Sequence, residues 1–229
     1  MNPPGTLPNN NIDQQAPVPH RSLLEEMNLP PKLIAFIREN SKRLQIGSIA
    51  FIVIIFSFIF YKNYTEKQED QAATMLASAL TEENATIKPE MLVNLIKEYP
   101  RTGAAVWSQV ELGHVAYEAK NYAEAINNYL TVIGKLKSQS PLLPLINFSL
   151  GQSYEGDGKY DQALTHYGKI ISVPGFTDQA YLAMGRIYEQ KGDTVKAREM
   201  YQKVGETGPN WVVDKIRKLD AGKSASNTP

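Results

Sequence analysis

The stretch LGQSYEGDGKYDQALTHY, residues 150–167, has two close counterparts in the same chain. Residues 112–129 read LGHVAYEAKNYAEAINNY, and residues 184–201 read MGRIYEQKGDTVKAREMY. Each copy has a glycine at its second position, an alanine 12 residues after the glycine and a tyrosine 16 residues after it. These positions are Gly113, Gly151 and Gly185; Ala125, Ala163 and Ala197; and Tyr129, Tyr167 and Tyr201. The glycines lie 38 and 34 residues apart, so the chain contains an internal repeat.

The repeated small residues have a simple physical use. Two helices that cross closely need glycine or alanine where their backbones meet, and the tyrosines can fill the gap to the neighbouring helix. Prolines mark the ends of the copies, at Pro100, Pro141, Pro174 and Pro209. No stretch of the chain alternates apolar and polar residues as a strand would. The sequence therefore predicts an all-α fold.

A period near 34 with this small, small, aromatic pattern resembles the tetratricopeptide repeat, over about residues 104–210. One such helical hairpin cannot bury its apolar face alone, whereas stacked hairpins bury a continuous core. The chain departs from the family at Gln109 and Asn147, where an aromatic residue is common, and in the longer first interval around KSQSPLLP. We expect an α-solenoid of three repeats at 101–208, a capping helix at 209–220 and a disordered tail at 221–229.

An apolar run precedes the repeats. The 18 residues from Leu44 to Tyr61 carry no charge, and as a helix they span roughly 27 Å, close to the thickness of a bilayer core. A cleaved signal peptide has a shorter apolar region near the N-terminus and a small-residue cleavage site, whereas here 43 residues precede the run and FYKNYTEKQED follows it. The run at 44–61 is therefore predicted to be an uncleaved, single transmembrane anchor.

Basic residues on the two sides of the run predict its orientation. Lys32, Arg38, Lys42 and Arg43 precede it, and Lys62 and Lys67 follow it. Because basic residues are retained on the cytoplasmic side of a membrane, four against two place the N-terminus in the cytoplasm. The repeats are then expected on the non-cytoplasmic side of the membrane.

The remaining segments complete the predicted organisation. Residues 1–20 are rich in Pro, Asn and Gln and are expected to be disordered. Residues 21–43 should form a cytoplasmic juxtamembrane helix that begins near Pro30 and Pro31. Residues 62–100 lack the glycine and alanine pair of the repeats and are expected to form a divergent helical hairpin. Its first helix can continue unbroken from the anchor, with Ala72, Ala73, Leu76, Ala79 and Leu80 on one side.

The resemblance to tetratricopeptide repeats also implies a binding surface. In that family the first helix of each repeat lines the concave face, and the equivalent residues are Trp107, Val110, His114 and Tyr117; Leu145, Phe148, Gln152 and Glu155; and Gln179, Leu182, Arg186 and Glu189. Aromatic and arginine side chains dominate the energetics of many interfaces. The residues expected to contact a partner are Trp107, Val110, His114, Tyr117, Phe148, Gln152, Leu182 and Arg186. For Trp107, packing against the preceding hairpin is an equal alternative.

The same positions lack the Lys, Asn and Arg clamp by which some repeat proteins grip the tails of cytosolic chaperones. The corresponding residues here include Val110, His114, Phe148, Ser149 and Gln152. A chaperone-tail receptor facing the cytosol is therefore disfavoured.

Composition argues against several other classes. Lysine plus arginine and aspartate plus glutamate both total 24, so no basic excess points to nucleic acid. The chain has no cysteine, and its histidines, His20, His114 and His166, are scattered along the sequence. No metal-binding, nucleophile-elbow or phosphate-binding motif occurs. We therefore expect no enzyme activity, no cofactor, no metal and no small-molecule substrate.

The layout of one anchor, a divergent hairpin and a few repeats is similar to that of the YfgM-like family of ancillary Sec translocon subunits. This resemblance implies a bacterial inner membrane with the repeats in the periplasm. It also implies a scaffold that binds protein partners and links the translocon to periplasmic chaperones. Two alternatives stay open: an assembly scaffold for another envelope machine, such as secretion, pilus or cell-wall synthesis, and a cytosol-facing import receptor.

Overall fold

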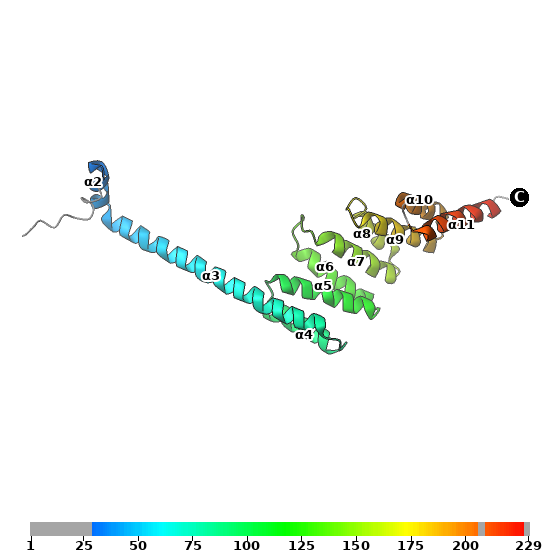
Figure 1. The fold of residues 1–229 in the computed structure, drawn as a ribbon, viewed down its shortest axis with the longest axis horizontal. Helices are drawn as coiled ribbons and strands as arrows, with labels where there is room; N and C mark the ends of the chain where they lie inside the picture. The colour runs from blue at the N-terminus through cyan, green and yellow to red at the C-terminus, as the bar shows by residue number, and fades with distance from the viewer. Residues whose placement is uncertain (1–28, 206–208, 227–229) are drawn as a thin grey trace, which may run out of the picture. The chain divides into compact units, whose positions relative to one another are not determined.

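The computed structural model of the chain describes residues 29–205 and 209–226, and these residues form helices and no strands (Figure 1). The helices are α2 (Pro31–Glu39), α3 (Ser41–Thr81), α4 (Ile87–Glu98), α5 (Gly103–Glu118), α6 (Tyr122–Lys135), α7 (Leu143–Gly156), α8 (Tyr160–Gly168), α9 (Thr177–Gln190), α10 (Thr194–Val204) and α11 (Asn210–Ser226). The chain divides into two compact units, Met1–Lys62 and Asn63–Pro229. The predicted disordered segment 1–20 lies outside the described residues.

The first unit contains α2 and the apolar part of α3. Helix α3 is the one described helix long and apolar enough to cross a membrane, and the protein covers none of its most apolar 18-residue window. The predicted anchor, residues 44–61, lies inside this helix. The first unit is therefore compatible with a single-pass membrane anchor. The expected juxtamembrane helix at 21–43 is described from Pro31, and it is interrupted at Asn40.

In the second unit, the end of α3 packs with α4 and α5. Ala72 of α3, Leu95 of α4 and Ala104 and Ala105 of α5 form one buried cluster. The Glu69 carboxylate accepts hydrogen bonds from the backbone N–H of Gly103, at 3.2 and 3.1 Å, where a negative charge favours the start of α5.

The predicted apolar side of this part of α3 is narrower than expected. Ala72 and Ala79 are completely buried and Leu76 is half-buried, whereas Ala73 is exposed and Leu80 is 48% exposed. Ala73 and Leu80 each follow a buried alanine by one residue and are therefore rotated about 100° away from it around the helix.

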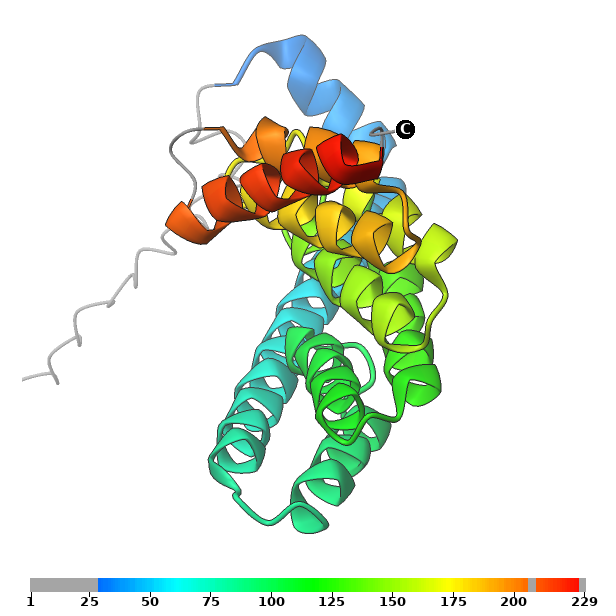
Figure 2. The ribbon, with the colours of Figure 1, turned by 90° about the vertical axis from the view of Figure 1, so that its right-hand side faces the viewer.

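The three repeats form the hairpins α5–α6, α7–α8 and α9–α10, which follow one another through the second unit (Figure 2). In each hairpin the glycine of the first helix lies against the tyrosine ring of the second. A Cβ atom on Gly113, Gly151 or Gly185 would lie 2.6, 2.5 or 2.6 Å from the nearest ring carbon, closer than real Cβ atoms approach. The three alanines of the pattern are completely buried. The predicted helix crossings are therefore present in the structure.

The first helix of each repeat also ends in the same way. The residue seven positions after the glycine has a positive φ, at 59° for Lys120 and 73° for both Gly158 and Gly192. The next residue then donates its N–H to a carbonyl five positions earlier, as in a Schellman motif. These bonds are Asn121 to Ala116, Lys159 to Tyr154 and Asp193 to Tyr188, at 2.8, 2.8 and 2.9 Å.

Helix α11 packs on the last repeat through Val212, which is completely buried, and through Ile216 and Leu219. Its end differs from the prediction. The expected capping helix stops at residue 220 and a disordered tail follows, whereas the structure continues the helix to Ser226. The residues after Asp220 include Ala221 and Lys223, which are good helix formers, and no proline lies between Asp220 and Pro229.

Candidate partner-binding surface

The first helices α5, α7 and α9 carry the residues that the repeat resemblance places on a binding face. Three of the eight candidates come together at a cleft of about 470 Å³: Tyr117 of α5, Gln152 of α7 and Arg186 of α9. The cleft is also lined by Glu155, Gly156, Tyr160 and Gln190. Its lining therefore comes from three successive repeats.

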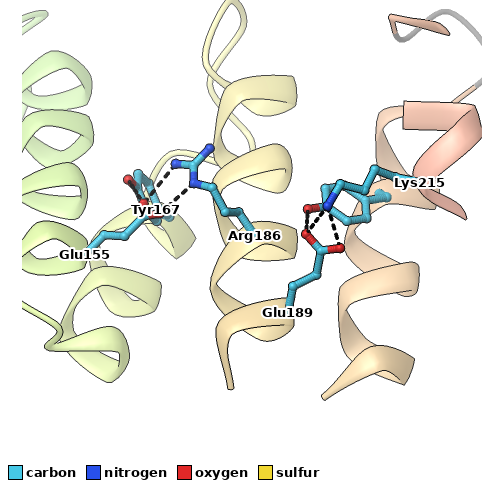
Figure 3. A network of polar contacts seen from close by, with 6 residues as sticks. Glu155, Tyr167, Arg186, Glu189 and Lys215 are labelled. Atoms are coloured by element: carbon cyan, nitrogen blue, oxygen red, sulfur yellow. Dashed lines mark hydrogen bonds and ion pairs between the residues drawn. The ribbon is translucent and has the colours of Figure 1, made fainter. Parts of the chain in front are cut away.

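A charged contact crosses this cleft. The Arg186 guanidinium donates hydrogen bonds to both carboxylate oxygens of Glu155, from Nε to Oε1 at 2.6 Å and from a terminal nitrogen to Oε2 at 2.9 Å. The Tyr167 hydroxyl donates to Oε2 of the same carboxylate at 3.0 Å (Figure 3). The hydrogen bond to Glu155 raises the pKa of the Arg186 guanidinium, and burial, followed by the Glu155 charge, raises that of the Tyr167 hydroxyl. The pair therefore joins α7 to α9 as a bidentate ion pair.

The next junction repeats this arrangement. The Lys215 ammonium of α11 lies 2.8 Å from both oxygens of the Glu189 carboxylate. The Tyr201 hydroxyl donates to Oε2 of Glu189, also at 2.8 Å. Glu155 and Glu189 both lie four residues after a repeat glycine. Each carboxylate thus accepts hydrogen bonds from the tyrosine of its own repeat and from a cationic side chain of the helix that follows this repeat.

The first junction lacks this charge pair. Tyr117 lies four residues after Gly113, where the later repeats have glutamate, and Gln152 stands where the third repeat has Arg186. The Tyr117 ring packs edge-on against Tyr122, with 5.6 Å between ring centroids. Tyr117 and Gln152 are both half-buried and border the cleft. This end of the cleft therefore presents an aromatic ring and an uncharged amide.

Three candidates occupy structural positions instead. Val110, Phe148 and Leu182 each lie three residues before a repeat glycine. Val110 is 1% exposed in the cluster that includes Ile146 and Leu150 of α7, so the prediction that it contacts a partner is wrong.

The other two residues of this set are half-buried. The Phe148 ring lies 5.8 Å from the Tyr167 ring and 6.1 Å from the Phe176 ring, measured between centroids. Leu182 packs against the cluster that contains Val212. Much of each side chain is therefore used for packing: Phe148 contacts its own repeat and the residue before α9, and Leu182 lies at the junction with α11.

The last two candidates, on α5, lie outside the cleft lining. Trp107 is 48% exposed and belongs to none of the apolar clusters among the described residues. His114 Nδ1 lies 3.4 Å from the Glu111 carboxylate, which also pairs with Lys88 at 2.7 Å. Burial opposes ionisation of Glu111, but the hydrogen bond and charge of Lys88, with the smaller contribution of His114, lower the pKa of this carboxyl.

Lys215, Tyr160 and Gln190 were not anticipated from the sequence. A sequence signal exists for Glu189 and Lys215. Glutamate occurs at the same repeat position in the last two repeats, and a pairing cation follows each, at Arg186 and at Lys215. Tyr160 and Gln190 belong to helix ends whose direction depends on the turns between helices, so no spacing rule identifies them.

Comparison with solved structures shows the same kind of fold. A tetratricopeptide repeat protein from Parabacteroides merdae ATCC 43184 matches with a TM-score of 0.57 at 14% identity, over 69% of this chain and 62% of that one. The chain thus spans less than two thirds of that protein. MamA matches with a TM-score of 0.51 at 20% identity, over 70% of this chain and 87% of MamA. The MamA RS-1 ArsTM double mutant has a TM-score of 0.51 at 16% identity, with 84% and 98% of the two chains covered.

Comparison with curated proteins finds no match. The sequence pattern of the tetratricopeptide repeat-like domain, however, matches residues 35–219. This range includes the apolar part of α3 as well as the three repeats and most of α11. The chain therefore belongs to the tetratricopeptide repeat-like domain family.

Proposed function

We propose that this chain is a membrane-anchored scaffold whose repeats bind polypeptide partners on the non-cytoplasmic side of a bacterial inner membrane. The observation that carries the proposal is the cleft formed by Tyr117, Gln152, Glu155 and Arg186, because it spans three repeats on the first-helix side. Domains of this family generally serve as protein-interaction scaffolds.

The chemistry of the cleft suits a polypeptide ligand. The Gln152 amide can both donate to and accept from a peptide backbone. The ring of Tyr117 offers an apolar face, and aromatic side chains are favoured at the centres of interfaces. Arg186 is 51% exposed although it pairs with Glu155, so its guanidinium can contact a ligand without losing that partner.

The exposure of the apolar helix supports the membrane anchor. Every large apolar residue from Ile46 to Phe60 is at least 40% exposed, so this helix is no core helix of the unit that contains it. Tyr61 and Tyr64 follow the run, and aromatic side chains favour the boundary between lipid and water. The four basic residues before the run and the two after it support a cytoplasmic N-terminus.

Within this proposal, we favour a role close to that of the YfgM-like family, linking the Sec translocon to periplasmic chaperones. The layout of anchor, divergent hairpin and three repeats supports it. An assembly scaffold of another envelope machine and a cytosol-facing import receptor are the alternatives, and they differ in partner and topology.

Site-specific photo-crosslinking in intact cells tests both the partner and the site. A photoreactive amino acid at Gln152 places the probe in the cleft, and one at Thr131, exposed on α6 and absent from the cleft lining, is the control. We expect adducts with translocon subunits or periplasmic chaperones from position 152 and not from position 131. Adducts with subunits of a different envelope machine would support the first alternative. Equal adducts from the two positions would refute the cleft as the binding site.

Topology has an independent test, because the chain contains no cysteine. A Thr131→Cys variant in spheroplasts should react with a membrane-impermeant maleimide without lysis. Labelling only after lysis would place the repeats in the cytoplasm and favour the receptor.

A further inference from the structure

Helix α2, Pro31–Glu39, separates its apolar and charged residues. At 100° per residue, Leu33, Ile34, Phe36 and Ile37 fall within an arc of about 160°. Lys32, Arg38 and Glu39 lie on the other side, together with Ala35, which is opposite the centre of the apolar arc. A short helix with this division has one side for an apolar environment and one for water.

No described part of the protein covers the apolar side completely. None of the residues of α2 is buried, and Leu33 and Phe36 are 43% and 55% exposed. Ile34 and Ile37 are half-buried. The apolar side therefore lacks the burial that normally holds so short a helix in a folded protein.

The helix ends before the apolar run begins. Asn40 leaves helical geometry, with φ −102° and ψ 14°, and α3 starts at Ser41 (Figure 1). Both the backbone N–H and the side-chain amide of Asn40 donate to the Phe36 carbonyl at 3.0 Å, which closes the last turn of α2. Because two separate helices meet here, α2 is free to take a direction different from that of α3.

The distance along the chain places α2 at the edge of the run. Residues 41–43 form about one turn, roughly 5 Å, between Asn40 and the first residue of the uncharged run, Leu44. Interfacial helices bury their apolar side about 5–10 Å into the boundary between headgroups and acyl chains. Lys32, Lys42 and Arg43 bring positive charge to the same level, and anionic headgroups attract such charges.

We propose that α2 is an interfacial helix that inserts Leu33 and Phe36 into the surface of an anionic bilayer, where its Lys32, together with Lys42 and Arg43 at the start of α3, pairs with phospholipid headgroups. This inference rests on the membrane anchor proposed above. Two observations favour lipid over a protein partner as the occupant: the apolar side adjoins the apolar run along the chain, and the neighbouring charges are mostly basic.

The absence of cysteine makes single labelling sites available for the test. The full chain is reconstituted in phosphatidylcholine vesicles with and without about 30% phosphatidylglycerol, an anionic lipid. An environment-sensitive fluorophore is attached to Phe36→Cys, on the apolar side, and to Ala35→Cys, on the opposite side, as the matched control. Iodide in the aqueous phase then quenches each probe according to its access to water.

We expect iodide to quench the probe at residue 36 about threefold less than the probe at residue 35 in anionic vesicles, because only residue 36 faces the lipid. The difference should shrink in neutral vesicles. Replacing Lys32, Lys42 and Arg43 together by glutamine should remove the dependence on anionic lipid. Equal quenching at residues 35 and 36 in anionic vesicles would overturn the inference. A protein partner would then be the alternative occupant of the apolar side of α2.

A third probe, on Phe56→Cys in the apolar run, separates this inference from the proposed anchor. Protection at residue 56 with equal quenching at residues 35 and 36 would refute the interfacial helix and leave the anchor intact. Iodide access at residue 56 would refute the anchor and, with it, the role of α2. Protection at both residue 56 and residue 36 would support the two together.

Discussion

The junction between the first and second repeats and the junction between the third repeat and α11 are formed by different interactions. At the first, Val110 of α5 and Ile146 and Leu150 of α7 belong to one buried apolar cluster. At the last, Val212 is the completely buried residue among positions 210–221 of α11, and the contact between Glu189 and Lys215 accompanies it.

The difference separates two requirements of a repeat array. Each hairpin needs its internal glycine–tyrosine contact, and all three repeats have it. The contact between neighbouring repeats is less constrained, because apolar burial and ion pairing can both supply it. Burial contributes about 25 cal/mol for each Å² of apolar surface, whereas a partly exposed ion pair contributes at most about 1 kcal/mol. We therefore expect the N-terminal junction to be the more stable.

The largest effect should come from filling the contact inside a hairpin. Gly151→Leu places a side chain where even a Cβ atom would lie 2.5 Å from the Tyr167 ring, and Tyr167 is completely buried. We expect a loss of about 4 kcal/mol in the free energy of unfolding. Urea unfolding of the full chain in detergent micelles, followed by circular dichroism, measures it. Gly134→Leu is the matched control, since nothing lies within 4 Å of the Cβ position there; equal losses would refute the helix-crossing geometry.

The second effect addresses the apolar junction directly. Leu150→Ala removes a completely buried side chain from the cluster between the first two repeats. Such truncations cost about 3 kcal/mol, because a cavity remains. The corresponding truncation at the other junction, Val212→Ala in α11, should lower the free energy of unfolding by less than about 2 kcal/mol, since the valine side chain is smaller. The same unfolding assay compares them, and a greater loss from Val212→Ala would reverse the order of the two junctions.

The third prediction concerns acid. His166 stacks on Tyr154 with 5.3 Å between ring centroids, and its Nδ1 lies 3.0 Å from Asn147 Oδ1. Burial, followed by the charge of Lys169, lowers the pKa of His166 from 6.5 to about 4. The folded state thus binds its proton at a lower pH than the unfolded state, and stability is lost as pH falls from about 6.5 to 4.

Discounted for the partial exposure of His166, the loss should reach about 2 kcal/mol at pH 4. Free energies of unfolding measured at pH 7, 5.5 and 4 give the slope of stability against pH. A His166→Gln variant keeps a side-chain donor but does not titrate, so its slope should be smaller. Parallel slopes for the two proteins would assign the acid sensitivity to carboxyl groups instead.

The smallest effect should come from the ion pair at the cleft. In a double-mutant cycle with Glu155→Gln and Arg186→Met, we expect a coupling energy of about 0.5 to 1 kcal/mol, because Arg186 is half exposed. Added salt should reduce it. A coupling above about 2 kcal/mol would mean that charge, and not apolar burial, holds this junction.

The repeat offsets in the sequence predicted the hairpins well, because glycine and tyrosine at fixed spacing have few other uses. The binding face was harder to predict. On a helical wheel, residues three before, one after and four after the glycine lie at about 60°, 100° and 40°, all on one side. The following element, however, packs against the first of these positions, at Val110, Phe148 and Leu182, whereas the cleft is lined from the other two by Tyr117, Gln152, Glu155 and Arg186. Which part of a helix its neighbour covers depends on the crossing of two hairpins, and a single-helix pattern does not contain that information.

Because the cleft is lined by residues of α5, α7 and α9, a ligand bound in it contacts three repeats at once. Ligand binding should therefore oppose the separation of one repeat from the next. A ligand that binds only the stacked state stabilises it by about 2.7 kcal/mol at a concentration one hundred times its dissociation constant. Such a ligand should therefore slow amide hydrogen exchange in α9 and α10, beyond its own footprint. The exchange rate at the less stable C-terminal end of the array would then depend on whether a partner is bound in the cleft.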